Sequence, residues 1–394
     1  MKEKTNSMYL QKVTLMGYKS IKDVVIDLVP GLNIMIGKNA AGKTNFLSFL
    51  DKCLSLNFEE MYFFSSWLEF KKGEDTIVLS SGKAFPPHHS MDDLLASKPQ
   101  SSIKINDGKT KVKNGIVEKS DLNKAGARYK NIFIRHGLPS YYPIVDAPLS
   151  FSMGKSIFPN ELLEIIKTTD SNFVNDLCFS LISSSFQFDN NTDPNDDFIR
   201  KMLSGTFSKL SELKNILTNF SPIKDIRLNE NFNIHIIDNT ETFIVSNLSF
   251  EFNIDGYWLP FSNLSDGTKR IFYILSETFD YYRLINDDYN RNYDNIQKII
   301  LIEEPELGVH PHQFKKIMDF LKEQSKTKQI IISTHSPQAL NVLDKNDLNR
   351  IIIAYSGADG TQLRHLEQQE INKARAYIDE VFLGDYWLYS DLEK

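Results

Sequence analysis

The chain has 394 residues, of which 41% are hydrophobic and 24% charged, a composition typical of globular proteins with core for two or three domains. The formal net charge of −6 excludes an overall positive field, so any contact with nucleic acid must come from a local patch. No apolar run is long enough to span a bilayer, no signal peptide is expected, and Cys53 and Cys178 lie in apolar runs. We therefore expect a cytoplasmic protein that contacts no membrane and keeps both thiols reduced.

The first elements lead into a candidate nucleotide site. Two strands are predicted around Leu10–Leu15 and Val24–Leu28, joined by a turn over Gly17–Asp23. A short apolar strand follows at Leu32–Ile36, and helical spacing begins at Lys43 and continues to about Leu56.

Between that strand and that helix stands the complete pattern G-x-x-x-x-G-K-[ST]. Its residues, with the one that follows, are Gly37, Lys38, Asn39, Ala40, Ala41, Gly42, Lys43, Thr44 and Asn45. The glycines let the backbone wrap a triphosphate with N–H groups and a helix N-terminus facing the anion. Lys43 would reach the β- and γ-phosphates, and the Thr44 hydroxyl would hold Mg²⁺. The structural alternative, a glycine-containing turn, does not require this strand–loop–helix context.

The middle of the chain carries weaker patterns. A strand is predicted over Phe70–Ser80, a hairpin over Ser101–Val117 with its turn at Asn106–Lys109, and a strand at Asn131–Ile134. The segment Lys104–Lys130 is locally basic. A solvated surface is the simpler interpretation, and a polyanion contact is the functional alternative.

Three helices are predicted next, around Leu162–Ile166, Phe173–Leu181 and Ile199–Leu217, with a breaker-rich turn at Asp189–Asp197. They form a helical insertion, which we interpret as a lid or arm. Strands then return at Ile223–Leu228, Phe232–Ile237, Phe243–Val245 and Leu248–Ile254.

The last third of the chain supplies further candidate residues. The run Leu264, Ser265, Asp266, Gly267 and Thr268 opens a helix that Ser265 would cap, with apolar positions continuing to Tyr282. A buried strand ends at Glu303 and Glu304, at the edge where α/β sheets place ligand-binding groups. We assign Glu303 to Mg²⁺ and Glu304 to polarising the attacking water.

A second buried strand, Ile330–Ser333, ends just before His335, which we assign to hydrogen bonding of a γ-phosphate. The pair His310 and His312, close to three glutamates, also fits a transition-metal site. The loop that follows a catalytic glutamate explains that pair better.

The order and detail of these motifs resemble an ABC-class ATPase head of the SMC/RecF/OLD-type branch. The matching stretches are Tyr18–Ser20, Gly37–Asn45, Leu264–Arg270, Glu303–Glu306 with His310-Pro311, and Ser333–Pro337. The resemblance is closest to the compact bacterial "AAA family ATPases", many of them from phage-defence systems. It implies an α/β fold: an ABC-type head with a mixed sheet around the P-loop core. Residues 1–60 and 221–394 would form this core, and 61–220 an insertion with strands and a helical lid.

The resemblance also implies a mechanism with ATP and Mg²⁺. Two copies would pack head to tail, as a homodimer or a higher even oligomer. Leu264, Ser265, Asp266 and Gly267 of one copy would face the γ-phosphate held at Lys43 of the other. Binding of ATP would then close the dimer, and hydrolysis would release it.

Three departures from the family pattern stand out. Glu303 replaces the aspartate usual in the broad ABC class, and His310 replaces the aspartate of the inter-subunit loop. The glutamine that normally links Mg²⁺ to the lid has only Gln100 and Gln187 as candidates.

The family pattern leaves three functions open. No Toprim nuclease domain is expected after His335 and no long coiled coil in the insertion, which favours an ATP-driven switch for a separate effector, such as a nuclease or toxin of an anti-phage system. A DNA-binding repair-type clamp of the RecF/SMC kind is the alternative. The third is a scaffold that binds ATP and hardly hydrolyses it.

Overall fold

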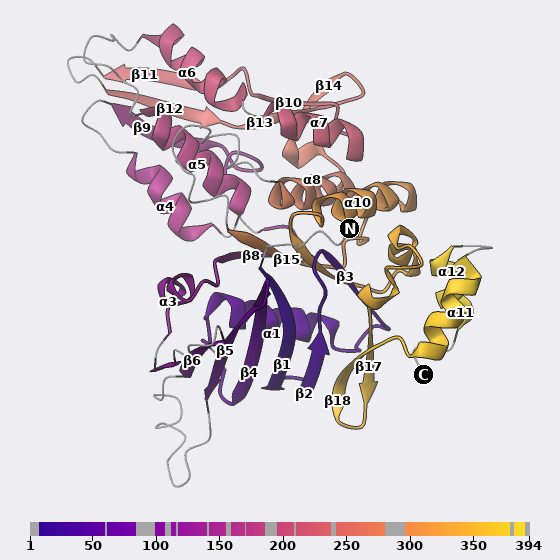
Figure 1. Cartoon of the computed structure of the whole chain (residues 1–394). Coiled ribbons are helices and arrows are strands. Elements are labelled where there is room, and N and C mark those ends of the chain that lie inside the picture. Colours follow the sequence, from indigo (N-terminus) through magenta and orange to yellow (C-terminus); the bar gives the residue numbers. More distant parts are fainter. Residues whose placement is uncertain are drawn as a thin grey trace. The chain divides into compact units, whose positions relative to one another are not determined.

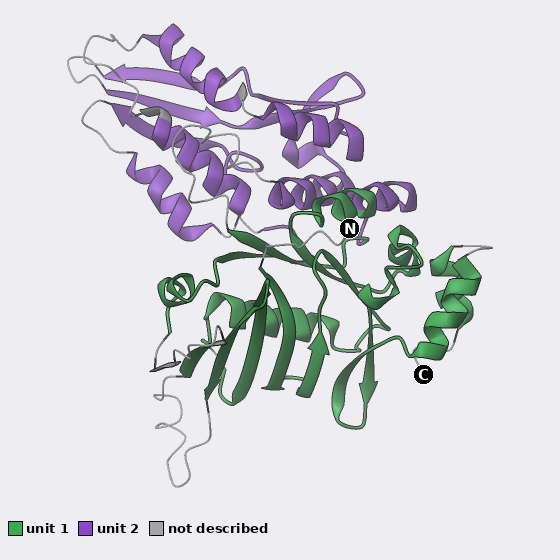
Figure 2. Ribbon diagram, viewed as in Figure 1, with its two compact units in different colours: residues 1–136, 292–306, 318–394 green, residues 137–291, 307–317 purple. Residues whose placement is uncertain are grey.

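The computed structural model describes residues 8–59, 61–83, 99–106, 112–115, 117–139, 142–154, 159–169, 171–185, 195–208, 210–237, 242–279, 296–378 and 382–390 (Figure 1). The chain divides into two compact units (Figure 2). Unit 1 contains residues 1–136, 292–306 and 318–394, and unit 2 contains residues 137–291 and 307–317. The division into a core of residues 1–60 and 221–394 and an insertion of residues 61–220 stays a prediction.

Unit 1 is built on a mixed sheet. Within the described residues it has 12 strands in the order β7-β6-β5-β4-β1-β2-β18-β17-β3-β16-β15-β8. In chain order these strands are β1 (Tyr9–Tyr18), β2 (Ile21–Asp27), β3 (Leu32–Ile36), β4 (Phe64–Lys72), β5 (Asp75–Lys83), β6 (Gln100–Asn106), β7 (Val112–Gly115), β8 (Tyr129–Ile134), β15 (Gln297–Glu303), β16 (Gln329–Thr334), β17 (Ile351–Gly357) and β18 (Gly360–His365).

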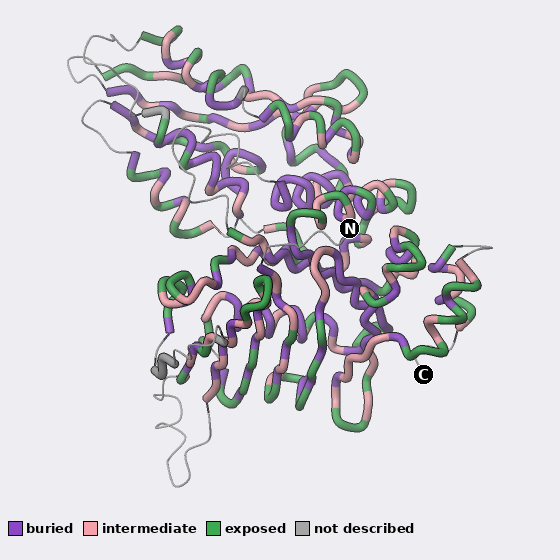
Figure 3. Tube along the Cα trace, in the orientation of Figure 1, coloured by how far each residue is buried: buried purple, intermediate pink, exposed green. Residues whose placement is uncertain are grey.

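The sheet has a parallel part and an antiparallel part. Strands β17, β3, β16, β15 and β8 pair in parallel, and every residue of β3 and β16 is buried (Figure 3). Continuous aliphatic runs such as Ile330–Ile332 fit strands covered on both faces. The strands from β7 to β2 pair antiparallel, and the burial of β2 and β4 alternates broadly along the strand, as it does where one face meets the core.

Helix α1 (Lys43–Ser55) fills the core of unit 1. It buries Phe46, Phe49 and Leu50 against the sheet because apolar residues recur at helical spacing on one face. The ring of Phe49 lies 4.9 Å from that of Tyr18 and 6.2 Å from that of Phe64. The other helices described in unit 1 are α3 (Lys119–Lys124), η2 (Pro337–Val342), η3 (Leu348–Arg350), α11 (Gln368–Ile378) and α12 (Leu383–Tyr389). Helix α10 (Pro311–Gln324) has residues 311–317 in unit 2 and 318–324 in unit 1.

Unit 2 combines helices with two small sheets, β10-β13-β14 and β11-β12-β9. Its strands are β9 (Leu149–Gly154), β10 (Asp225–Leu228), β11 (Asn233–Ile237), β12 (Thr242–Leu248), β13 (Phe250–Ile254) and β14 (Tyr257–Pro260). Its described helices are α4 (Asn160–Thr168), α5 (Asn172–Ser185), α6 (Asp196–Ser208), α7 (Ser211–Phe220), η1 (Phe261–Asn263) and α8 (Asp266–Thr278).

Aromatic rings form the centre of unit 2. The rings of Phe252 and Phe272 lie 5.0 Å apart, edge to face, and Tyr142 packs beside Phe272 with its hydroxyl 2.9 Å from Ser276 Oγ. Glu277 is buried in the same core, where burial raises the pKa of its carboxyl group and the backbone N–H of Asn172 donates to it. Helix α8 is therefore anchored by both apolar and polar contacts.

Two element predictions were wrong. The strand expected over Phe70–Ser80 is a hairpin of β4 and β5, because Gly73 adopts φ +59° and turns the chain in two residues. The third helix divides into α6 and α7, with Leu210 at the N-cap of α7. The apolar periodicity continues through the break because both helices bury their apolar face, which hid the division.

Other predictions were confirmed where residues are described. The hairpin of β1 and β2, strand β3, helix α1 and the antiparallel arms β6 and β7 are as expected, as are β8, β15 and β16. Residues 107–109 of the predicted turn, 189–194 of the breaker-rich segment, and Tyr282 lie outside the described residues.

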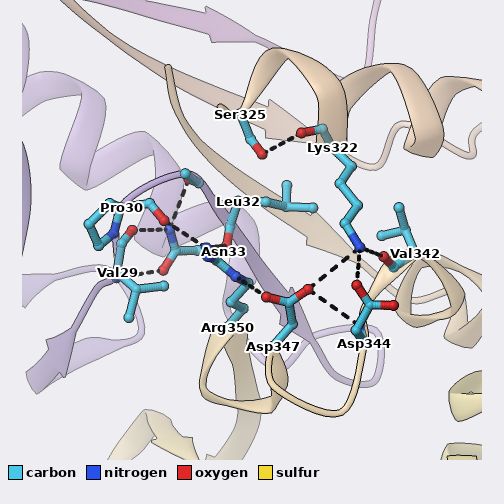
Figure 4. Close-up of polar contacts among 11 residues, drawn as sticks. Val29, Pro30, Leu32, Asn33, Lys322, Ser325, Val342, Asp344, Asp347 and Arg350 are labelled. Carbon is cyan, nitrogen blue, oxygen red and sulfur yellow. Dashed lines mark hydrogen bonds and ion pairs between the residues drawn. The ribbon is translucent and has the colours of Figure 1, made fainter. Parts of the chain in front are cut away.

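A polar cluster fixes the amino end of β3 (Figure 4). Arg350 Nη1 donates to the carbonyls of Pro30 and Leu32 at 2.6 and 3.0 Å, and its Nε lies 2.8 Å from Asp347 Oδ1. Lys322 approaches Asp347 to 3.5 Å. Burial alone would raise the pKa of Asp347, but the hydrogen bond from Arg350 and the nearby cations hold it below its usual value.

We predict that Asp347→Asn lowers the free energy of unfolding by about 1–2 kcal/mol at neutral pH. Because the native pKa is depressed, the contribution is complete above the unfolded pKa of about 3.9 and is lost as the pH falls through the lower native pKa. Denaturant titrations at pH 7 and pH 3 should therefore show a difference between wild type and variant that shrinks at the lower pH. An equal difference at both pH values would contradict this account.

Candidate functional site

The loop Gly37–Thr44 joins β3 to α1, as its pattern predicts. At Gly37 a Cβ atom would lie 2.0 Å from the carbonyl oxygen of Ala354 in β17. At Gly42, where φ is +88°, it would lie 1.8 Å from Thr361 Oγ1 in β18. Both glycines are therefore required by close packing against the β17–β18 hairpin, and Gly42 also by its backbone conformation.

The loop concentrates positive charge at the start of α1. Lys43 is only 5% exposed, and its Nζ donates to the carbonyls of Gly37 and Lys38 at 2.7 and 2.9 Å. Among the described residues no side chain caps α1 at Gly42, and its first turn contains no acidic residue. An uncapped helix N-terminus beside a buried ammonium group suits the binding of phosphate.

The stretch Tyr18–Ser20 supports this loop from the side. Asn45 Nδ2 donates to Ser20 Oγ at 2.7 Å, and that hydroxyl lies 2.7 Å from Thr361 Oγ1. Two hydrogen bonds thus connect the β1–β2 turn, the first turn of α1 and the start of β18. The sequence pattern gave no reason for Asn45, and the structure supplies one.

Glu303 ends β15 and is nearly buried, with its side chain 4% exposed. Burial alone would raise the pKa of its carboxyl group. Hydrogen bonds from the Thr44 hydroxyl and from His136 outweigh that effect and lower the pKa, so Glu303 is a carboxylate at neutral pH.

His136 is a site residue that the sequence reasoning missed. Its Nδ1 lies 3.0 Å from Glu303 Oε2, and its backbone N–H is 3.3 Å from the same oxygen. The cause is the parallel pairing of β8 with β15, in which Ile134 faces Ile302 and the following residues meet at one edge. A histidine just after a predicted strand was the available signal, but which strand neighbours β15 cannot be read from the sequence.

Glu304 and His335 extend from the same edge. Glu304 has φ +44°, an uncommon conformation for a residue with a side chain, and its N–H donates to the carbonyl of Ser333 at 2.8 Å. Its Oε1 lies 3.7 Å from His335 Nδ1, and its side chain is 25% exposed. Unit 1 therefore brings together five predicted residues: Lys43, Thr44, Glu303, Glu304 and His335.

The run Leu264–Gly267 belongs to unit 2 and opens α8. Ser265 Oγ accepts the N–H of Thr268 at 3.2 Å, which confirms the predicted cap. Leu264 is buried and Asp266 is exposed. At Gly267 a Cβ would lie 2.4 Å from the carbonyl oxygen of Gly308, so packing alone already requires a glycine there.

His310 and His312 form hydrogen bonds at the start of α10. His310 Nδ1 accepts the N–H of His312 at 3.3 Å, and the carbonyl of His310 accepts the N–H of Phe314, at the start of α10. Within the described part of the chain, no group of three or more His, Cys, Asp or Glu side chains is arranged to hold a metal ion. Gln100 begins β6 opposite Gly82, and Gln187 lies outside the described residues.

The mixed α/β fold of the chain is the fold of SMC head domains. The fold is similar to that of an Smc head bound to the C-winged helix domain of ScpA, with 16% identity, a TM-score of 0.51, and 92% of this chain and 99% of that chain covered. The fold is also similar to that of an Smc head domain with an extended coiled coil bound to the C-terminal domain of ScpA, from Pyrococcus furiosus. The identity there is 14% and the TM-score 0.51, and the match covers 95% of this chain and 100% of that chain.

The chain belongs to the family described as "AAA domain, putative AbiEii toxin, Type IV TA system", which matches residues 70–341 and so more than half of it. Residues 8–125 also match an "AAA ATPase domain".

A short stretch matches the DNA replication and repair protein RecF. The identity over 40 residues is 48% for Bifidobacterium longum subsp. infantis and 45% for Streptococcus agalactiae serotype Ia. The match covers 10% of this chain and 10–11% of those proteins, so the chain aligns with about a tenth of their length. Among the described residues, no helix combines the length and apolarity needed to cross a membrane.

Proposed function

We propose that this chain is an ATP-binding and ATP-hydrolysing head that dimerises on ATP and acts as a switch for a separate effector. One observation carries the proposal: the ends of β3, β16 and β15 bring a buried lysine, a hydroxyl, two carboxylates and a histidine to one edge of the sheet. That set contains a group for each task in ATP hydrolysis.

The phosphates of ATP would bind at Lys43 and the N-terminus of α1. Thr44 and Glu303 would hold Mg²⁺, and a hydroxyl with an ionised carboxylate is the oxygen donor set that this ion prefers. The ion would neutralise charge on the β- and γ-phosphates. His136, bonded to Glu303 by both its ring and its backbone, would fix the orientation of that carboxylate.

Glu304 is the group we assign to the attacking water. It is more exposed than Glu303, and its backbone is held in the left-handed region by its bond to Ser333. Such a conformation persists only where the surroundings fix it, and it is frequent at active sites. His335 would contact the γ-phosphate and respond to its loss.

The N-terminus of α8 would supply the other half of each site. Ser265, the N–H of Gly267 and the helix dipole form an anion-binding group. In a head-to-tail dimer this group would face the γ-phosphate held at Lys43 of the second copy. ATP would then favour the closed dimer by its contacts with both copies.

A separate effector protein is inferred from the family description. The family description names a toxin and a toxin–antitoxin system, and such systems contain two components. This supports a partner protein, which we propose to be a nuclease or toxin of an anti-phage system.

We predict that Glu304→Gln binds ATP as the wild type does but hydrolyses it at least about 100-fold more slowly, because general-base catalysis typically contributes that factor. The mass of this variant in solution should double on addition of ATP, as a monomer becomes a dimer.

Two variants act as controls. Lys43→Ala should neither bind ATP nor dimerise, and Glu323→Gln, which changes an exposed carboxylate of α10, should behave as the wild type. Wild-type turnover by Glu304→Gln would refute the assignment. Negligible turnover by the wild type itself would identify the scaffold alternative.

A mixing experiment tests the shared sites. Lys43→Ala and Ser265→Arg should each be inactive alone. In a mixed dimer Lys43 of the Ser265→Arg copy meets Ser265 of the Lys43→Ala copy, so one composite site is intact. The mixture should therefore hydrolyse ATP, below the wild-type rate, where neither variant alone does. Absence of recovery, with dimers confirmed by mass, would show that Lys43 and Ser265 do not act across copies.

The RecF match favours a second candidate function, a clamp that ATP closes on DNA. Several basic side chains of the described part of 104–130 are exposed, among them Lys104, Lys124 and Arg128. If the clamp exists, gel shifts with duplex DNA should weaken steeply between 50 and 200 mM salt, because phosphate contacts release counterions, by a factor of about 10³ for six contacts. The triple change of these residues to alanine should reduce the shift. No shift at low salt with ATP would reject the clamp.

A further inference from the structure

Glu306 makes a set of contacts that the proposed chemistry does not yet use. It lies in the turn after β15, and a single oxygen, Oε1, accepts two hydrogen bonds and lies close to a ring nitrogen. The Thr334 hydroxyl donates to it at 2.6 Å, the backbone N–H of His335 at 2.9 Å, and His335 Nδ1 lies 3.2 Å away.

The contacts extend along the segment between β16 and η2. Thr334 Oγ1, which donates to Glu306, also accepts the N–H of Ser336 at 2.9 Å. One carboxylate oxygen therefore fixes the backbone on both sides of His335, as well as one edge of its ring. Few side chains could do this, because the acceptor must carry several lone pairs and no proton.

The burial of Glu306 lowers the stability of the fold. The Glu306 side chain is 10% exposed, and its second oxygen, Oε2, is buried without a hydrogen-bond partner among the described residues. A buried, unpaired carboxylate oxygen carries a desolvation cost. Burial of an apolar side chain would avoid that cost, so stability does not explain a glutamate at this position.

We propose that Glu306 is a positioning residue that fixes the orientation of the His335 ring and keeps its Nδ1 protonated. The inference rests on the proposed role of His335. A carboxylate can only accept hydrogen bonds, so the Nδ1 that faces Glu306 carries the proton. Nδ1 faces the carboxylates of Glu304 and Glu306, and Nε2, on the opposite side of the ring, is left to meet the γ-phosphate. Phosphate oxygens only accept hydrogen bonds, so in the ATP complex Nε2 must carry a proton as well, and the ring would be an imidazolium between carboxylates and phosphate.

This proposal predicts a change that is visible without nucleotide. In the wild type, the ¹⁵N resonances of the His335 ring should show a protonated Nδ1, and in Glu306→Ala they should shift as the proton distributes over both nitrogens. With ATP, kcat should fall about 10- to 100-fold, a range typical of small misplacements, while KM changes less than about twofold.

Two further variants act as controls. Glu306→Gln has nearly the same size and keeps an acceptor oxygen, so it should fold and recover part of both signals. Glu370→Gln removes a carboxylate of similar burial, 19% exposed and paired with Arg364, from the same unit. It should lower stability without changing the His335 resonances or kcat.

A double-mutant cycle separates this role from an independent one. In a His335→Ala background, Glu306→Ala should have no further effect on kcat, since its only contribution acts through the histidine. Multiplicative losses, or His335 resonances unchanged in Glu306→Ala, would overturn the proposal. Wild-type turnover by His335→Ala would instead reject the proposed role of His335, and the resonances would still decide whether Glu306 fixes its ring.

Discussion

The parallel pairing of β16 with both β3 and β15 is the constraint on which the site depends. In that register Thr334 faces Ile36, and Ser333 faces Glu303. Three connections therefore leave the sheet at one edge: the phosphate-binding loop, the turn with the glutamates, and the segment with His335. Helix α1 beneath the sheet and the β17–β18 hairpin beside the loop then fix the details. The chemistry needs no further element of unit 1 to bring these groups together, apart from the neighbouring strand β8 that adds His136.

The sequence was informative where the required residues are close together in the chain. The loop Gly37–Thr44 and the capping serine, Ser265, are local patterns, and their surroundings came out as predicted. The β4–β5 hairpin was missed because a single strand was predicted across Gly73 and Glu74, where the chain reverses. His136 and Glu306 were missed for another reason. Their meaning depends on which strands are neighbours and on which donors surround an oxygen, and no spacing in the sequence encodes either.

The two ends of the parallel strands differ in how well their polar groups are satisfied. At the amino end of β3, Arg350 satisfies two carbonyls and a carboxylate, and the charges balance. At the carboxyl end, Glu304 has a strained backbone and Glu306 keeps an unpaired oxygen. Stability gained in the first region can offset the cost of the second. Such a division is expected of a sheet that must hold reactive groups in a fixed geometry.

The contact between Gly42 and Thr361 makes the residue allowed at one position depend on the residue at the other, although the two are far apart in the sequence. The Thr361 side chain fills the space that any side chain at residue 42 would need. The two positions are thus free to vary only together, and a larger residue at 361 would press on the nucleotide loop without touching its motif. A screen that reads the loop pattern alone would accept such a sequence as intact. The geometry of the nucleotide loop therefore depends partly on the β17–β18 hairpin, which contains no recognisable sequence motif.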